Sequence, residues 1–233
     1  FWFEGRNRLI IHTLRKFAPN MHSFIEIGCG TGFVLTAISQ FFPHTRLVGA
    51  EYFAQGLDIA KSRVSNADFY LLDARDMPFQ EEFDVVGLFD VIEHIKEDEQ
   101  TLREVARTLK TNGLMIITVP QHQFLWSTAD EYKNHERRYD RDDLIDKVER
   151  AGMEVLYTTS FVTFLLPIML LSRVWQNRST MPADRMKEFS MPPLINAIFN
   201  QLMRVETALT KLGLQYRLGG SRLLIARKFN ADQ

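Results

Sequence analysis

The chain has 233 residues, of which 45% are hydrophobic and 24% charged, a balance typical of one globular domain with a sizeable core. Its formal net charge of −1 argues against a general nucleic-acid-binding surface. The single cysteine, Cys29, excludes a disulfide framework within the chain and favours a reducing compartment, so we expect a cytoplasmic protein. The sequence has neither an initiator methionine nor a signal-peptide pattern, and we expect it to begin inside a longer natural chain.

The first elements predicted along the chain alternate between helix and strand. Residues 6–17 are expected to form a helix, because Ile10, Leu14 and Phe17 recur at helical spacing before the break at Pro19. Apolar runs then predict strands at 23–28, 45–51, 68–74, 83–89, 114–120 and 153–159, with a turn at Asn112-Gly113. Helical patterns lie between them, at about 31–40, 54–64, 98–109 and 140–151. This alternation predicts a doubly wound α/β fold, with a mostly parallel sheet covered on both faces.

The alternation stops after Ser160. Two apolar helices are predicted at about 166–175 and 193–212, followed by a final strand at 221–228. We therefore expect a single domain over 1–233, with an N-terminal helix in 1–20, a ligand-binding core in 21–160, a helical insertion in 161–215 and the last strand and tail in 216–233. The longest apolar run, 161–171, is shorter than the roughly 20 residues that cross a bilayer.

A glycine-rich turn follows the first predicted strand, in the stretch FIEIGCGTGF at 24–33. Ligands bind at the carboxyl ends of parallel strands, so the turn is expected to line a site. A dinucleotide fingerprint spaces its glycines as G-x-G-x-x-G, whereas the pattern here is G-C-G-T-G, which differs by one residue. The alternative is that these glycines only make a tight turn between strand and helix.

Three acids point to the kind of ligand. Glu51 ends the second strand, where a carboxylate can accept both hydroxyls of a ribose. Asp73 ends the third, placed to bond an adenine amino group while Leu72 or Ala74 covers the ring. Glu26 lies two residues before the first glycine, where it can meet an ammonium group. Acids without a basic residue in the turn disfavour a pyrophosphate and favour a ligand with an ammonium and a sulfonium. The alternatives are that Glu51 is a solvated surface acid and Asp73 a turn former.

Five segments then carry a resemblance to a known family: EIGCGTG, VGAEY, LLDARDMPF, FDVVGLFDVIEHI and NGLMIITVP. In order and spacing they resemble the class I S-adenosylmethionine-dependent methyltransferases, and look most like the small-molecule branch that includes ubiquinone-biosynthesis-type enzymes. The resemblance covers residues 23–119 and continues more weakly to 157. It implies a Rossmann-like seven-stranded sheet with an antiparallel last strand, S-adenosylmethionine as the cofactor and S-adenosylhomocysteine as its product.

The resemblance also implies roles for individual residues. The glycines would approach the methionine part of the cofactor, Glu51 would hold the ribose, Asp73 would read the adenine and Asp90 would border the methyl-transfer site. The alternative for Asp90 is that it caps the following helix. The residues predicted to bind the cofactor are Glu26, Gly28, Cys29, Gly30, Gly32, Glu51, Tyr52, Asp73, Ala74 and Asp90.

Methyl transfer from a sulfonium is an in-line displacement, so the protein mainly aligns the acceptor and excludes water. A general base is needed only when the acceptor must lose a proton. Three histidines are candidates for that base: His94, the first choice, after the fourth strand, His122 beyond the fifth strand, and His135 in NHERRY. A structural role is the alternative for each, and no metal is expected.

A polar and aromatic loop at 120–140 is predicted to wall the acceptor pocket. Its predicted substrate contacts are Trp126, Arg137, Arg138 and Tyr139. The two arginines would hold a carboxylate or phosphate of the acceptor by bidentate hydrogen bonds. The alternative is that they pair with acids of the loop, namely Glu131, Glu136 and Asp140.

The inserted segment has several open interpretations. Residues 161–175 are apolar nearly all round, which favours burial or lipid contact over a solvated helix. The insertion is predicted to form a lid over an apolar acceptor, a dimer face or a peripheral membrane contact, with a plain core role as the alternative.

The sequence therefore predicts an S-adenosylmethionine-dependent methyltransferase for a small molecule, either lipid-like or carboxylated. One alternative is a catalytically silent binding or regulatory protein of the same fold. A second, an NAD-dependent oxidoreductase, would need the dinucleotide glycine spacing that is absent here. A nucleic-acid acceptor is disfavoured by the neutral charge, despite a basic strip at Lys133, Arg137, Arg138 and Arg141.

Overall fold

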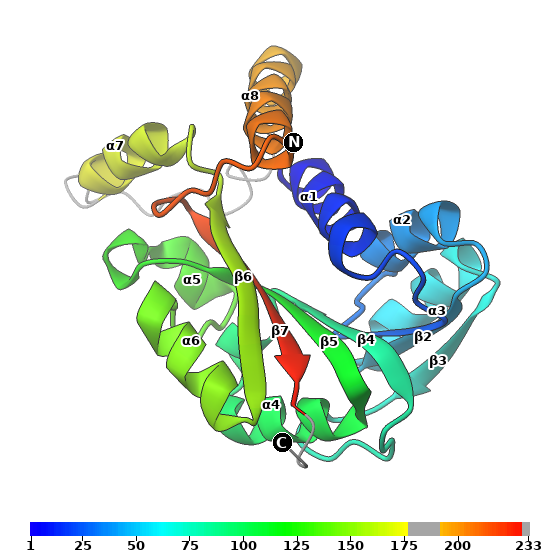
Figure 1. Cartoon of the computed structure of the whole chain (residues 1–233). Helices are drawn as coiled ribbons and strands as arrows, with labels where there is room; N and C mark the ends of the chain where they lie inside the picture. Colours follow the sequence, from blue (N-terminus) through cyan, green and yellow to red (C-terminus); the bar gives the residue numbers. More distant parts are fainter. Residues whose placement is uncertain (177–191, 230–233) are drawn as a thin grey trace.

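Seven strands form one sheet in the order β3-β2-β1-β4-β5-β7-β6, and helices cover both of its faces in the computed structural model (Figure 1). The structure describes residues 1–176 and 192–229, so the expectations for 177–191 and 230–233 lie outside it. The strands are β1 (Ser23–Ile27), β2 (Arg46–Glu51), β3 (Ala67–Leu71), β4 (Phe83–Phe89), β5 (Leu109–Pro120), β6 (Met153–Phe161) and β7 (Ser221–Lys228).

The strand directions confirm the expected fold class. The neighbours from β3 to β5 pair in parallel, whereas β7 is antiparallel to both β5 and β6. The helices are α1 (Trp2–Phe17), α2 (Phe33–Phe41), α3 (Ala54–Arg63), α4 (Asp98–Thr108), α5 (Thr128–Tyr132), α6 (Arg141–Arg150), α7 (Leu166–Gln176) and α8 (Pro193–Lys211), with 3₁₀ turns at Ile92–His94 and Gln123–Leu125.

Two apolar layers hold the helices on the sheet. Alternate side chains of a strand point to opposite faces, and β7 shows this clearly. Leu223 and Ile225 pack in the layer that contains α1 and α2, whereas Leu224 and Ala226 pack in the layer that contains α4 and α6. Each strand of the centre is therefore apolar on both sides, as a doubly covered sheet requires.

The strand order reverses beside β1, which lies between β2 and β4. From β1 the chain first builds outward through β2 and β3, and then returns to add β4 and β5 on the other side. In open α/β sheets, ligands bind outside the carboxyl ends of the strands at such a reversal. The segments that follow β1, β2 and β4 are therefore expected to line a ligand site.

Two local predictions differ from the structure. The turn predicted at Asn112-Gly113 lies within β5, where Asn112 adopts a φ of 62° and the register against β4 shifts between Phe83 and Val85. The segment therefore forms an irregularity in the strand and does not precede it. The loop predicted at 120–140 also contains the short helix α5, where the Ser127 backbone N–H donates to the Asp130 carboxylate at 2.9 Å in a capping box.

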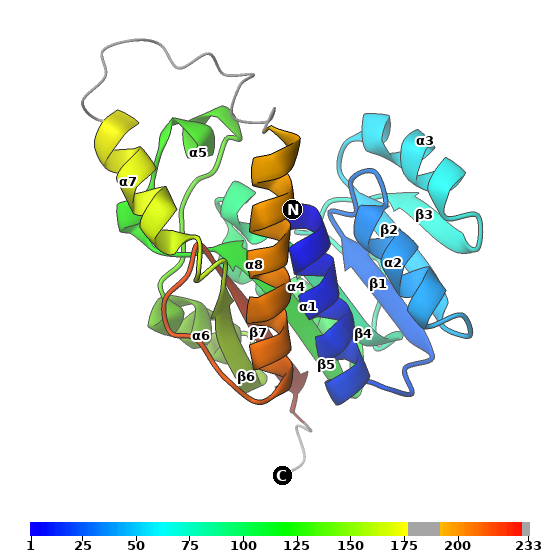
Figure 2. The same cartoon turned by 90° about the horizontal axis from the view of Figure 1, so that it is seen from above.

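The second inserted helix packs against the N-terminal helix, and Figure 2 shows α8 and α1 side by side. The rings of Phe1 and Phe199 meet edge to face with centroids 5.3 Å apart, and Arg8 donates to the Asn200 side-chain oxygen at 2.6 Å. Met203 of α8 lies buried in the same apolar layer as α1. Within residues 1–176 and 192–229, every helix falls short of the length and hydropathy that a bilayer crossing requires.

Candidate active site

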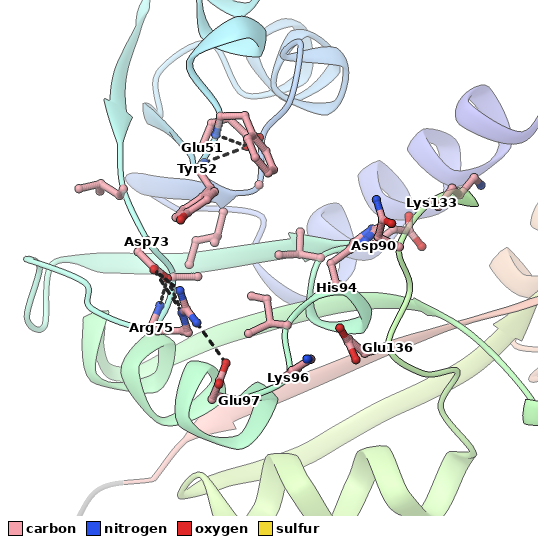
Figure 3. A pocket seen from close by; sticks show the side chains of 18 residues that line it. Glu51, Tyr52, Asp73, Arg75, Asp90, His94, Lys96, Glu97, Lys133 and Glu136 are labelled. Atoms are coloured by element: carbon pink, nitrogen blue, oxygen red, sulfur yellow. Dashed lines mark hydrogen bonds and ion pairs between the residues drawn. The ribbon is translucent and has the colours of Figure 1, made fainter. Parts of the chain in front are cut away.

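A cavity of about 650 Å³ opens at the carboxyl ends of β1, β2 and β4 (Figure 3). One side of it is formed by Glu51, Asp73 and Arg75, and the other by Asp90 and His94. The complete lining of this first cavity is Ile27, Gly28, Glu51, Tyr52, Phe53, Leu72, Asp73, Ala74, Arg75, Asp90, Val91, His94, Ile95, Lys96, Glu97, Lys133, Asn134 and Glu136.

The glycine turn has the backbone conformation that only glycine adopts without strain. Gly28 has a φ of 68°, and a Cβ atom added there would lie 2.5 Å from a methyl group of Val91. Gly32 also has a positive φ, of 75°, but it begins α2 and packs against Ala60 of α3. Gly32 lines neither of the two cavities described here, so the structure gives it a packing role instead of the predicted approach to a ligand.

Glu51 organises the loops around the first cavity. One of its carboxylate oxygens accepts from the Gly30 backbone N–H at 2.8 Å. The other accepts from the backbone N–H groups of Tyr52, at 2.8 Å, and Phe53, at 3.0 Å. The oxygen bound to Gly30 has a further lone pair, so Glu51 can also accept a hydroxyl donor from a ligand in the cavity.

Asp73 lies on the same side of the first cavity as Glu51 and is held by a residue, Arg75, that the sequence analysis did not select. The Arg75 guanidinium donates to it at 2.7 Å and also reaches Glu97 at 3.1 Å. Hydrogen bonds from Arg75 lower the pKa of Asp73, although its partial burial acts in the opposite direction. Leu72 and Ala74 flank it in the cavity wall, which gives this end both an acceptor and an apolar surface.

A second cavity, of about 430 Å³, adjoins the first. The two share Gly28, Asp90, His94 and Lys133 as a common wall. The complete lining of the second cavity is Trp2, Phe3, Arg6, Glu26, Gly28, Cys29, Gly30, Thr31, Phe33, Val34, Phe89, Asp90, Glu93, His94, Pro120, Ala129, Asp130, Lys133, His135, Arg138, Met169, Gly220 and Ser221.

Glu26 lies at the inner end of the second cavity. It is only 3% exposed, and its carboxylate accepts from the Leu35 backbone N–H at 3.1 Å. Burial raises the pKa of Glu26 to about 8, and the nearby Arg6 only partly offsets this. A cationic group entering the cavity would favour the ionised carboxylate and so gain an ion pair there.

Asp90 is bound by the N-terminal helix. The Arg6 guanidinium of α1 makes an ion pair with the Asp90 carboxylate, and the Thr118 hydroxyl donates to the same oxygen at 3.2 Å. The alternative that Asp90 caps the following helical turn is therefore wrong, because its side chain is turned toward α1 and β5. The sequence analysis missed Arg6. Its only local signal is a charged residue beside Gly5 in the amphipathic helix α1.

Glu93, His94 and His135 meet in the second cavity. Glu93 is completely buried, and neither of its carboxylate oxygens has a hydrogen-bond partner. The rings of His94 and His135 meet edge to face at 4.7 Å, and one ligand atom from each of the three residues lies within 4.8 Å of the others. The three side chains are thus close enough to hold a metal ion or to act together on one polar group.

Burial and neighbouring charges shift the pKa values of Glu93 and His94 toward their uncharged forms. Burial and the neighbouring His135 lower the pKa of His94. Burial and the neighbouring Asp90 carboxylate raise the pKa of Glu93 well above its ordinary value. The second cavity thus holds a neutral imidazole, which can accept a proton, beside a carboxyl group that favours its protonated form.

His135 is oriented by Asp130, which the sequence analysis also missed. The His135 Nδ1 atom lies 2.9 Å from Asp130, whose carboxylate also accepts two hydrogen bonds from Arg138, both at 2.9 Å. These hydrogen bonds from His135 and Arg138 lower the pKa of Asp130 despite its burial. The other ring nitrogen of His135, Nε2, is therefore the one available toward the cavity.

Besides Gly32, four predicted residues lie outside both cavities: His122, Trp126, Arg137 and Tyr139. His122 is 3.2 Å from Asp140 and stacks on Phe124. The Tyr139 hydroxyl is buried and donates to Asp98 at 2.7 Å, and Arg137 pairs with the same carboxylate at 2.6 Å. The structure thus gives Tyr139 and Arg137 structural partners where acceptor contacts were predicted.

The arginine pair at 137–138 does not present unpaired guanidinium groups. Arg138 lines the second cavity but is neutralised by Asp130, and Arg137 is neutralised by Asp98. The alternative that these arginines pair with acids is therefore correct. Their partners are the buried Asp98 and Asp130, however, and not Glu131, Glu136 and Asp140. Arg141 pairs with Asp142 at 2.5 Å, which further weakens the proposed basic strip.

Part of the chain is similar to known methyltransferases. A methyltransferase-domain model matches residues 25–117. The malonyl-[acyl-carrier protein] O-methyltransferase of Bacillus cereus is 24% identical over 157 residues, covering 60% of this chain and 58% of that protein. The demethylmenaquinone methyltransferase of Thermotoga maritima is 27% identical over 99 residues, covering 42% of this chain and 43% of that protein. The chain thus spans about half the length of these relatives.

Solved structures show the same fold over nearly the whole chain. The YcgJ protein of Bacillus subtilis superposes with a TM-score of 0.59 at 17% identity, covering 97% of this chain and 99% of that one. Phosphoethanolamine N-methyltransferase 2 of Haemonchus contortus, solved with S-adenosyl-L-methionine, gives 0.64 at 18% identity, covering 97% of this chain and 53% of that one. The domain model and the relatives make this chain similar to S-adenosylmethionine-dependent methyltransferases, in support of the resemblance to their class I, small-molecule branch, and the solved structures show the same fold.

Proposed function

We propose that this chain binds S-adenosylmethionine in the first cavity and methylates a small-molecule acceptor held in the second. The observation that carries the proposal is the common wall of the two cavities at Gly28, Asp90 and His94, where a donor and an acceptor would meet. When bound, S-adenosylmethionine supplies a methyl group on a sulfonium that is already activated for transfer. The task left to the chain is to align the two molecules and to exclude water.

The residues present fit this cofactor. Glu51 has a lone pair for a ribose hydroxyl, and Asp73 with Leu72 and Ala74 offers an acceptor beside an apolar surface for adenine. Glu26 lies in β1, two residues before Gly28 of the common wall, and lines the second cavity, so the methionine part of the cofactor would cross that wall and place its ammonium beside Glu26. A pyrophosphate fits poorly, because these contacts are all acidic. This argument favours the methyltransferase over an NAD-dependent oxidoreductase.

His94 is the proposed general base for acceptors that must lose a proton. It borders both cavities, and its lowered pKa keeps the imidazole neutral near pH 7. His135, oriented by Asp130, is the second candidate in the same cavity. His122 is no longer proposed, since it lies outside both cavities.

Calorimetric titration with S-adenosylhomocysteine, with NAD as the parallel ligand, tests this function. We expect micromolar affinity for the former, corresponding to roughly −8 kcal/mol, and no binding of NAD. The Glu51→Gln variant should bind at least about tenfold more weakly, because a hydrogen bond to a charged group contributes about 1.5–3 kcal/mol.

The matched control is Glu82→Gln. Glu82 precedes β4, at the edge of the sheet opposite the cavities, and its carboxylate pairs with Arg46 at 2.6 Å. This variant should keep the wild-type affinity. Failure to bind either ligand would contradict the proposal. Cofactor binding without turnover of any acceptor would favour a catalytically silent binding protein of this fold.

Peripheral membrane contact through 161–175 stays a prediction. Its support is the row of exposed apolar side chains on α7, namely Ile168, Leu170 and Leu171. Such a patch is typical of an interaction surface.

A further inference from the structure

A third cavity, of about 240 Å³, continues from the second toward the inserted helices. Its lining comes from the start of α1, from the segment after β6 and from α7 and α8: Phe1, Trp2, Val162, Leu165, Ile168, Met169, Ser172, Phe199, Gly220 and Ser221. It shares Trp2, Met169, Gly220 and Ser221 with the second cavity. The two spaces are therefore neighbours with a common wall.

The third cavity differs from the second in chemistry. Aromatic and aliphatic side chains form most of its lining, and Ser172 and Ser221 are the only polar side chains in it among the described residues. None of these side chains carries a charge. A chain of methylene groups would be stabilised there, whereas a polar group would lose its hydration without gaining a partner.

The third cavity also reaches the surface. Ile168 lines it and is 47% exposed, and Leu171, on the same helix, is 70% exposed. Ile195 and Ile198 of α8 are exposed as well. An apolar chain longer than the cavity would therefore emerge onto a surface that is itself apolar.

The second cavity, in contrast, is lined by many polar and ionisable side chains. Four acids and three basic side chains line it, together with His94 and His135. The two arginines in it, Arg6 and Arg138, already pair with carboxylates. Glu93 is fully buried, and its oxygens have no hydrogen-bond partner, so it can accept from a donor on a ligand. A carboxylate head would find both guanidinium groups of this cavity already paired, whereas a neutral hydroxyl can bond the Glu93 carboxyl group.

We propose that the acceptor is an uncharged amphiphile, whose hydrogen-bond-donating head lies in the second cavity beside Glu93 and His94 while its hydrocarbon tail fills the third. This inference rests on the proposed methyltransferase function. It chooses the lipid-like acceptor over the carboxylated one, and it gives α7 and α8 a role in selecting the tail.

The test uses 4-alkylphenols with tails from methyl to octyl, titrated calorimetrically into protein saturated with S-adenosylhomocysteine. Each buried methylene contributes about 0.8 kcal/mol, so the dissociation constant should fall roughly fourfold per added carbon until the cavity is full. The corresponding 4-alkylbenzoates, which carry a charged carboxylate head, should bind more weakly at every length. A dissociation constant independent of tail length, or benzoates that bind as well as phenols, would overturn the proposal.

Two variants locate the tail. Ser172→Phe fills the third cavity from its wall, and Ile168→Asp places a charge at its exposed rim. Both variants should lose most of the increase in affinity that the wild type shows between the methyl and the octyl phenol. The matched control Leu171→Phe adds the same ring one residue away on exposed surface and should keep the gain. Equal gains in all three variants would overturn the assignment of the tail.

The failure of this inference can be distinguished from failure of the proposed function. Affinity for S-adenosylhomocysteine is measured first for every variant, and it reports on the cofactor site, which contains neither Ser172 nor Ile168. Retained affinity without dependence on tail length would contradict the amphiphile and leave the methyltransferase proposal standing. Loss of that affinity in the wild type would contradict the function on which the inference rests.

Discussion

At the scale of single residues, a buried acid of β1, Glu26, makes the stability of the protein depend on pH. Glu26 is 3% exposed, and burial raises its pKa to about 8 from a value of 4.5 in the unfolded chain. Between these values the folded protein keeps a proton that the unfolded chain has lost. The stabilisation is thus fully present below about pH 4.5 and is lost as the pH rises through about 8.

We therefore expect the free energy of unfolding to fall as the pH rises from 5 to 8, with Glu26 contributing a slope of up to about 1.4 kcal/mol per pH unit. Urea unfolding at several pH values measures it. Glu93 acts in the same direction, because its pKa is also raised. The contribution of Glu26 is therefore the difference between the wild type and Glu26→Gln. The surface variant Glu149→Gln should keep the wild-type slope; a Glu26→Gln slope equal to that of the wild type would show that Glu26 ionises normally in the fold.

His94 carries the proposed proton transfer. With an acceptor that must lose a proton, such as a 4-alkylphenol, His94→Asn should lower kcat by about 10²- to 10⁴-fold, because it removes a positioned base. Its affinity for S-adenosylhomocysteine should change much less. The rate of S-adenosylhomocysteine formation measures the effect, with His44→Asn, on the exposed turn before β2, as the control. If both variants turn over alike, the base is another group.

At the scale of elements, a single buried carboxylate joins α4 to α6 and to the loop before it. Asp98, 4% exposed at the start of α4, accepts from the Tyr139 hydroxyl at 2.7 Å and from Lys147 of α6 at 2.6 Å. Asp98→Ala leaves the Lys147 ammonium without this partner in a largely buried position. We expect the free energy of unfolding to fall by on the order of 3 kcal/mol, as measured by urea denaturation.

The neighbouring residue provides the control. Glu99, also on α4, pairs with Arg150 of α6 at 3.0 Å, but both side chains are exposed. Solvent and salt screen such a pair, so Glu99→Ala should cost less than about 1 kcal/mol. Equal losses in the two variants would mean that burial of the Asp98 cluster adds nothing to its stabilising effect.

At the scale of the whole molecule, the features predicted best were those that depend on neighbours in sequence. Alternating apolar runs predict the strands, and an acid directly after a strand, such as Glu51 or Asp73, must lie at the edge where ligands bind. The predicted roles of these residues remain predictions, but their meeting around one cavity follows from the order of the strands.

The features that sequence analysis missed depend on contacts between distant segments. Arg6 reaches Asp90 across 84 positions in the chain, and no local pattern specifies that pair. The partner of Arg138 was misjudged for a related reason. Asp130 begins α5 as part of a capping box, and this short helix turns it into the cavity, away from the solvent where loop acids were expected.

The third cavity has one more consequence, which concerns how such a protein can change its substrate. The first cavity is lined only by residues between 27 and 136, whereas the third is lined only by residues 1, 2 and those between 162 and 221. The two ends of the reaction are thus encoded in separate stretches of the chain. Replacing α7 and α8 by the corresponding helices of another protein would change the proposed tail site and leave the proposed cofactor site intact. Acceptor specificity could then change through one stretch of the chain.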